Sequence, residues 1–328
     1  MDTLEDKFNT EEGCYSGYGE VDVERDGVSA QGELGFVGAG QDVRSFTRVY
    51  REGQTDRSVV IFPGLGETSA QFNGDFLTVL MKVLGDSLDN TDILAVDTVG
   101  RAVNVEVYGG TLKGRVKDAQ STVAALDEAG KLAKEIVIIA HSAGFLDALA
   151  VMRNVGSRVS DVIALNPVVD VGKWELGFLA PKFVWLVKKY LVSTFLNVLK
   201  NKGGVIQLQE QDHNRIMFSG DENGDHYVRG FDDSSRVFWD MCMKHGRWFD
   251  DLFEEGGAAK DTNFHIMRGR YDKAIPFKTI ENWMKSIKGK VNVTLENVPD
   301  FEHSIPYTMS DFKKDTMGLY LKKVLPGV

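Results

Sequence analysis

The feature that most constrains the fold is a series of short runs of aliphatic and β-branched residues, separated by segments of helical spacing. Apolar runs of this kind are typical of strands buried on both faces. The runs are Ser58–Phe62, Asp92–Val96, Glu135–Ile139, Asp161–Leu165, Phe264–Met267 and Val291–Leu295, with helical spacing at Phe76–Leu84, Val116–Leu132, Phe145–Met152 and Ile280–Ile287. Strands that alternate with helices predict parallel βαβ units with right-handed crossovers. We therefore expect an α/β fold with a doubly wound, mostly parallel sheet, whose ligands bind at the carboxyl ends of the strands.

Three parts are predicted along the chain. Residues 1–43 are acidic and rich in glycine, and we expect an N-terminal arm with one strand or two. Residues 44–170 and 263–328 carry the alternating pattern and form the core. Residues 171–262 contain no buried run, but aromatic and aliphatic residues recur there at helical spacing. This interval is predicted to be a helical cap, inserted after the sixth strand.

The net charge and the length of the apolar runs exclude several classes of function. The chain has 38 basic and 48 acidic residues, a formal charge of −10, and an acidic surface repels nucleic acid. The longest charge-free stretch, Ile136–Leu146, is far shorter than the ~20 apolar residues that span a bilayer. The N-terminus lacks the basic and then apolar order of a signal peptide. We therefore expect a soluble, cytoplasmic protein without a transmembrane segment.

No metal or cofactor is predicted. The acidic segment Asp221–Asp225 is similar to a calcium loop, but the sixth and twelfth positions hold His226 and Asp232 instead of glycine and glutamate. A solvated turn is the favoured interpretation. The histidines and the two cysteines also lack the paired spacing of a zinc site.

The most informative motif joins the run at Glu135–Ile139 to a helix through Ala140-His141-Ser142-Ala143-Gly144. This is the arrangement of a nucleophile elbow, Gly-x-Ser-x-Gly, with alanine at the first glycine. The serine of such an elbow lies on a sharp turn, so its neighbours two residues away must be small. Ser142 is therefore the candidate nucleophile. The alternative is an ordinary turn in which the serine caps the helix.

A nucleophilic serine needs a histidine base and an acid, in the chain order serine, acid, histidine. His303 is the candidate base, because it alone of the later histidines lies in a loop directly after a predicted core strand. Asp272 follows the preceding strand and is the candidate acid, with Asp170 in reserve. Taken singly, Asp272 and His303 could each be solvated loop residues.

Two backbone N–H groups are expected to form an oxyanion hole. One belongs to Ala143, the residue after the candidate nucleophile. The other belongs to Leu65, in the glycine-rich loop after Ser58–Phe62. A plain glycine-rich turn would explain the glycines of that loop, but not its place beside the elbow.

Four segments in order resemble the α/β-hydrolase superfamily: Phe62–Ser69, Ala140–Gly144, Gly269–Pro276 and Phe301–Ser304. Within it, Gly64–Phe72 is most similar to the monoacylglycerol lipase and lysophospholipase branch. The resemblance implies that Ser142 is the nucleophile, Asp272 the acid and His303 the base. The chain departs from that branch at Pro63-Gly64, where His-Gly is usual, and at Asp97–Ala102, where Asp-x-Arg-Gly-His-Gly is usual.

These observations together predict a serine hydrolase that cleaves an apolar carboxylic ester, such as a lipid-like molecule. The residues expected to line its pocket are Gly64, His141, Phe183, Trp185, Trp239 and Trp248. The same catalytic groups also serve thioesters, amides and carbon–carbon bonds, and a non-catalytic ligand-binding protein is a further alternative. The cap is expected to cover the pocket; its lysines at 182, 188 and 189 leave weak contact with a membrane surface as an alternative.

Overall fold

The structure is a computed structural model of the whole chain. It describes residues 15–37, 44–53, 55–64, 67, 69–97, 112–169, 249–272, 275–303, 305 and 309–327. Most of the predicted cap, residues 171–248, lies outside the described residues. The boundaries of the cap and core therefore stay predictions.

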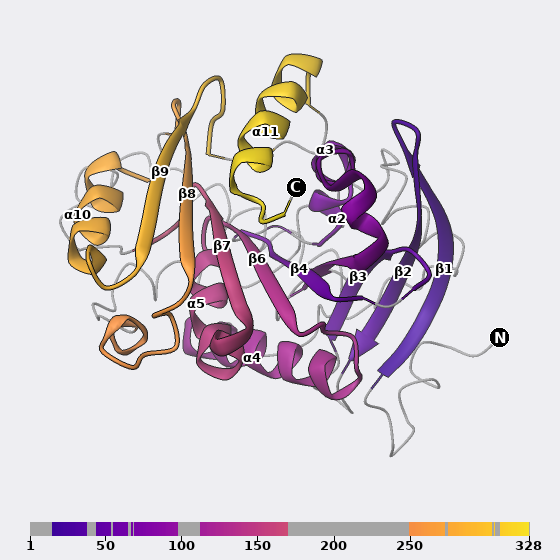
Figure 1. Cartoon of the computed structure of the whole chain (residues 1–328), viewed down its shortest axis with the longest axis horizontal. Helices are drawn as coiled ribbons and strands as arrows, with labels where there is room; N and C mark the ends of the chain where they lie inside the picture. Colours follow the sequence, from indigo (N-terminus) through magenta and orange to yellow (C-terminus); the bar gives the residue numbers. More distant parts are fainter. Residues whose placement is uncertain are drawn as a thin grey trace, which may run out of the picture.

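A nine-stranded sheet forms the centre of the fold, with the order β1-β2-β3-β5-β4-β6-β7-β8-β9 (Figure 1). Its strands are β1 Tyr15–Arg25, β2 Val28–Val37, β3 Arg44–Tyr50, β4 Arg57–Phe62, β5 Thr91–Val96, β6 Glu135–His141, β7 Val159–Leu165, β8 Asn263–Gly269 and β9 Asn292–Val298. The strands from β5 to β9 in this order pair in parallel, whereas β1, β2 and β3 join the edge at β5 in antiparallel fashion. The predicted doubly wound, mostly parallel sheet is confirmed.

Burial along the strands explains why the sequence pattern was so clear. Every residue of β5 is buried, and so is every residue of β4 and β6 after the first. Most side chains on both faces of these strands are therefore apolar, since helices cover both faces. The edge strand β9 instead alternates exposed and partly buried residues.

Helices cover the two faces of the sheet (Figure 1). One face packs against α3 (Asp75–Leu84) and α11 (Asp311–Val324), and α2 (Ser69–Phe72) also lies there. The other packs against α4 (Leu112–Glu128), α5 (Gly144–Val155) and α10 (Phe277–Ile287). Short 3₁₀ helices lie at Gly85–Asn90, Gly156–Arg158 and Asp250–Phe253. On the α5 side, Phe145 and Trp283 meet edge to face, with ring centroids 5.3 Å apart.

The N-terminal arm contributes two full strands to the sheet. β1 and β2 form an antiparallel hairpin that turns at Asp26 and Gly27, both with positive φ. Because the arm supplies two strands, the interval predicted as a cap follows β7, the seventh strand, and not the sixth. No helix among the described residues has both the length and the apolar character needed to cross a membrane.

Candidate active site

Ser142 occupies the sharp turn between β6 and α5. Its φ angle is +50°, a left-handed conformation that is uncommon for residues other than glycine. Two backbone hydrogen bonds hold the turn: Ser142 N–H donates to the Leu165 carbonyl at 2.9 Å, and Val168 N–H donates to the Ser142 carbonyl at 3.0 Å. This is the backbone geometry of a nucleophile elbow.

Gly144 is the position at which the elbow tolerates no side chain. A Cβ atom there would lie 2.7 Å from the Pro63 carbonyl oxygen and closer still to that of Phe62. The start of α5 therefore packs directly against the backbone at the end of β4. Ala140 is fully buried within β6, so alanine suffices at the first small position of the motif.

The structure brings the three distant residues Ser142, His303 and Asp272 together. The Ser142 Oγ lies 2.8 Å from His303 Nε2, and the His303 Nδ1 lies 3.1 Å from Asp272 Oδ2. They follow β6, β9 and β8, whose carboxyl ends meet at one edge of the sheet. Ser142 is 6% exposed and the Asp272 side chain is fully buried, while the His303 side chain is 26% exposed. The hydroxyl, imidazole and carboxylate are thus arranged in one hydrogen-bonded chain.

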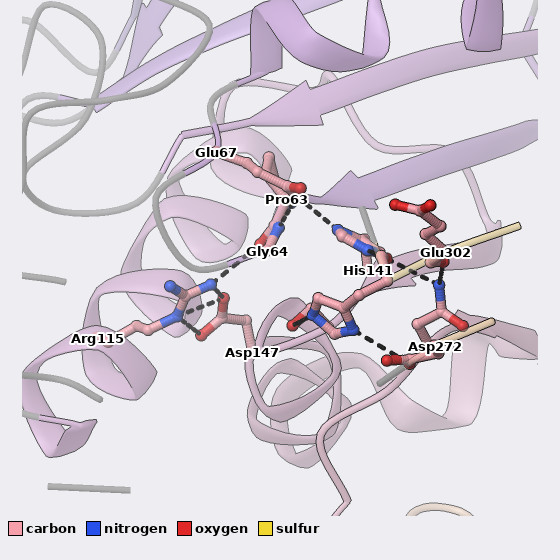
Figure 2. Close-up of polar contacts among 11 residues, drawn as sticks. Pro63, Gly64, Glu67, Arg115, His141, Asp147, Asp272 and Glu302 are labelled. Carbon is pink, nitrogen blue, oxygen red and sulfur yellow. Dashed lines mark hydrogen bonds and ion pairs between the residues drawn. The ribbon is translucent and has the colours of Figure 1, made fainter. Parts of the chain in front are cut away.

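The Asp272 carboxylate is held in place by its own loop. Its Oδ1 accepts a hydrogen bond from Ile275 N–H at 3.2 Å. Its Oδ2 is directed at His303, along the dashed line from Asp272 in Figure 2. The backbone carbonyl of Asp272 accepts from Arg268 Nη2 at 2.9 Å. Asp170, the reserve acid, lies outside the described residues.

His141, which the sequence placed in the substrate pocket, is 1% exposed and bonded at both ring nitrogens. Its Nδ1 lies 2.5 Å from the Glu67 carboxylate and its Nε2 lies 2.7 Å from the His303 carbonyl oxygen (Figure 2). Burial alone would lower the pKa of His141. The charge and hydrogen bond of Glu67, with smaller effects of the His303 carbonyl and the Asp272 charge, outweigh burial and raise that pKa above 6.5. Because both partners can accept hydrogen bonds, each ring nitrogen is placed to donate one, and the raised pKa favours the protonated ring.

Asn166 joins the loops that carry the base and the acid. It directly follows β7, with a φ of +46°. Its Nδ2 donates to the carbonyls of Glu302, at 2.7 Å, and His303, at 2.8 Å, while its Oδ1 accepts from Gly269 N–H at 2.6 Å. Sequence analysis missed this residue. The available signal was an Asn-Pro pair at the carboxyl end of a buried strand.

The loop after β4 is held by two ion pairs, Arg115–Asp147 and Glu67–His141. Sequence analysis did not predict either pair. Arg115 Nε donates to the Asp147 carboxylate at 2.9 Å, and its Nη2 donates to the Pro63 carbonyl at 3.0 Å. On the other side of the same peptide, Gly64 N–H donates to Glu67 Oε2 at 2.6 Å. Figure 2 shows the two ion pairs on opposite sides of Pro63 and Gly64. The peptide between Pro63 and Gly64 is therefore fixed at its oxygen and its N–H.

The predicted oxyanion residues are described only in part. Ala143 lies at the amino end of α5 and is 1% exposed. Leu65 lies outside the described residues, as do the pocket candidates Phe183, Trp185, Trp239 and Trp248. Within the part of the chain that the structure describes, no group of three or more histidine, cysteine and acidic side chains is placed to hold a metal ion.

Comparisons with known proteins identify the fold. No protein-family model matches the chain, and no curated protein matches it in sequence. Among solved structures, a carboxylesterase of Nitrososphaera gargenis is similar at 13% identity and a TM-score of 0.57, over 88% of this chain and 98% of the other. A monoglyceride lipase of Saccharomyces cerevisiae is similar at 16% identity and a TM-score of 0.52, over 88% of this chain and 92% of the other. A peroxisomal α/β-hydrolase of the same yeast is similar at 13% identity and a TM-score of 0.58, over 96% of this chain and 90% of the other. With its mostly parallel sheet and flanking helices, the chain has the α/β-hydrolase fold.

Proposed function

We propose that the protein is a serine hydrolase that cleaves an apolar carboxylic ester through an acyl-enzyme on Ser142. The observation that carries this proposal is the continuous hydrogen-bonded chain from the Ser142 hydroxyl through His303 to Asp272. A serine hydroxyl is a weak nucleophile unless a base removes its proton, and this arrangement provides that base. The strained φ of Ser142 supports the proposal, because it directs the hydroxyl out of the turn toward His303.

The reaction follows from the roles of these groups. His303 Nε2 takes the proton of Ser142 as the Oγ attacks the ester carbonyl, and Asp272 stabilises the imidazolium that forms. The Ala143 N–H at the start of α5 donates to the developing oxyanion, aided by the helix dipole. His303 then protonates the leaving alcohol. It next activates a water molecule that releases the acid and restores Ser142.

The second oxyanion donor is expected in the loop after β4. Pro63 has no N–H, and the Gly64 N–H already donates to Glu67 at 2.6 Å. The next N–H along the chain is that of Leu65, which is the donor that we propose. The carboxylesterase and the monoglyceride lipase with this fold support an ester as the substrate.

A fluorophosphonate probe, which reacts with activated serines, tests the proposal. The wild-type protein should be labelled, the Ser142→Ala variant should not, and Ser286→Ala, which changes an exposed serine of α10, should label normally. A folded wild-type protein that resists labelling would favour a ligand-binding protein. If Asp170→Asn slowed labelling more than Asp272→Asn, the acid would be Asp170.

The class of substrate is tested with a panel of nitrophenyl esters of increasing acyl length, together with an amide and a thioester. We expect turnover of the esters to rise with acyl length and to exceed that of the amide. Preference for the thioester would instead indicate a thioesterase using the same groups.

A further inference from the structure

The carbonyl of His303 is the point at which the proposed base is attached to the rest of the site. It accepts two hydrogen bonds, from His141 Nε2 at 2.7 Å and from Asn166 Nδ2 at 2.8 Å. The His303 side chain projects from a loop and is 26% exposed, so packing alone does not fix its position. Two donors on its own carbonyl constrain the backbone from which the imidazole extends.

His141 is well suited to this task because it is itself held firmly. Its other nitrogen lies 2.5 Å from the Glu67 carboxylate, and the same Oε2 atom accepts from Gly64 N–H at 2.6 Å. The contacts thus form one chain from the loop after β4, through Glu67 and His141, to the loop after β9. Residues at its two ends are more than two hundred positions apart in the sequence. The raised pKa of His141 favours the protonated ring, which has a donor at each nitrogen.

We propose that His141 is a positioning residue, which ties the backbone of His303 to Glu67 and thereby sets the base between Ser142 and Asp272. This inference rests on the proposed function for its effect on rate. It gives His141 a role different from the pocket-lining role expected from the sequence. The His141 and His303 rings also lie side by side, with centroids 5.4 Å apart.

Two isosteric variants separate the contacts of His141. The amide nitrogen of glutamine takes the place of histidine Nε2, so His141→Gln keeps a donor for the His303 carbonyl and loses the one for Glu67. The amide nitrogen of asparagine takes the place of Nδ1, so His141→Asn keeps the donor for Glu67 and loses the one for His303. Both variants remove the same charge and break the same buried ion pair, so loss of the charge alone would affect them alike.

With the best nitrophenyl ester, we expect kcat to fall about 100-fold in His141→Asn, as for a base displaced by roughly an ångström. In His141→Gln, kcat should fall only about tenfold. KM should change little in either variant. The matched control is His265→Asn, which removes the Nε2 donor of another histidine–carboxylate pair, with Asp161 at 2.9 Å, toward the opposite end of the strands. It should leave kcat unchanged. Equal kcat in the two His141 variants, or a rise in KM alone, would overturn the proposal.

A readout independent of turnover separates this inference from the proposed function. The proton that His303 Nδ1 shares with Asp272 should give a low-field NMR resonance, assigned by its loss in His303→Ala. We expect this resonance to persist in His141→Gln and to broaden or disappear in His141→Asn. If the wild-type protein neither labels nor hydrolyses esters, the proposed function fails, and this resonance still decides the positioning role. Its persistence in His141→Asn would refute that role.

Discussion

Gly144→Ala tests whether the elbow depends on direct contact between α5 and the end of β4. The added Cβ would lie 2.7 Å from the Pro63 carbonyl oxygen and closer to that of Phe62. Phe62 ends β4, a strand paired on both sides, and the Pro63 carbonyl is held by Arg115, so neither oxygen can easily move away. Such overpacking costs about 1–3 kcal/mol, occasionally more. The gain in helix propensity from glycine to alanine, at most about 1 kcal/mol, cannot offset it. The shift of α5 would also move the Ser142 turn.

Urea unfolding of Gly144→Ala and of a matched variant, Gly318→Ala, measures this cost. A Cβ on Gly318, within α11, would lie 3.6 Å from the Val79 side chain, an ordinary van der Waals contact. We expect Gly318→Ala to be as stable as the wild-type protein or up to about 1 kcal/mol more stable. The Gly144 variant should unfold at lower urea and label slowly with the fluorophosphonate probe. If it kept wild-type stability and labelling, the argument from close approach would be wrong.

Three further predictions concern the polar contacts around the site. Asp147→Asn leaves the buried Arg115 guanidinium without its counter-charge, and urea unfolding should show a loss of about 3–5 kcal/mol in the free energy of unfolding. The raised pKa of His141, next to Glu67 and Asp272, gives stability that is fully present below pH 6.5 and is lost as the pH rises through the folded-state pKa. The difference in free energy of unfolding between the wild-type protein and His141→Gln should therefore shrink toward high pH; a difference that grew would contradict the ion pair. Asn166→Ala removes the second donor to the His303 carbonyl, and nitrophenyl ester assays should show kcat reduced about tenfold at an unchanged KM.

The central strands could be predicted because burial on both faces leaves a strong signal in the sequence. The run predicted at Ser58–Phe62 is β4 with one residue added. The predicted end of a strand is less exact where the strand loses its apolar character. The last strand was predicted to end at Leu295, but β9 continues to Val298 through Glu296 and Asn297, which the edge of the sheet leaves partly exposed.

The helix α11 was not predicted, because its buried residues are widely spaced among lysines and aspartates. Thr316, Met317, Leu321 and Val324 are its buried residues. The local signal at its start is Ser310, whose side chain accepts from Lys313 N–H at 3.4 Å. This N-cap residue indicates where a helix begins, but it does not indicate that the helix packs on α3.

The three candidate catalytic residues could be proposed from sequence, because each stands after a strand and strand ends meet at one edge of a parallel sheet. The residues that hold them could not. Glu67 and His141 are 74 positions apart, and Arg115 and Asp147 are 32 apart. No local pattern in the sequence indicates that these residues pair. The one hint is Asp147, a charged residue within the buried face of α5, since a charge in that position requires a partner.

The placement of the two ion pairs indicates what they contribute. A buried ion pair often stabilises a fold no more than apolar residues of similar volume, because desolvation offsets the attraction. Apolar packing, however, cannot fix which way a peptide group faces. Arg115 fixes the Pro63 carbonyl, Glu67 fixes the Gly64 N–H, and His141 fixes the His303 carbonyl. Each of these contacts orients a backbone group beside Ser142. We infer that the charges serve to orient the loops of the site, and that replacing both members of a pair with apolar residues would preserve stability better than activity.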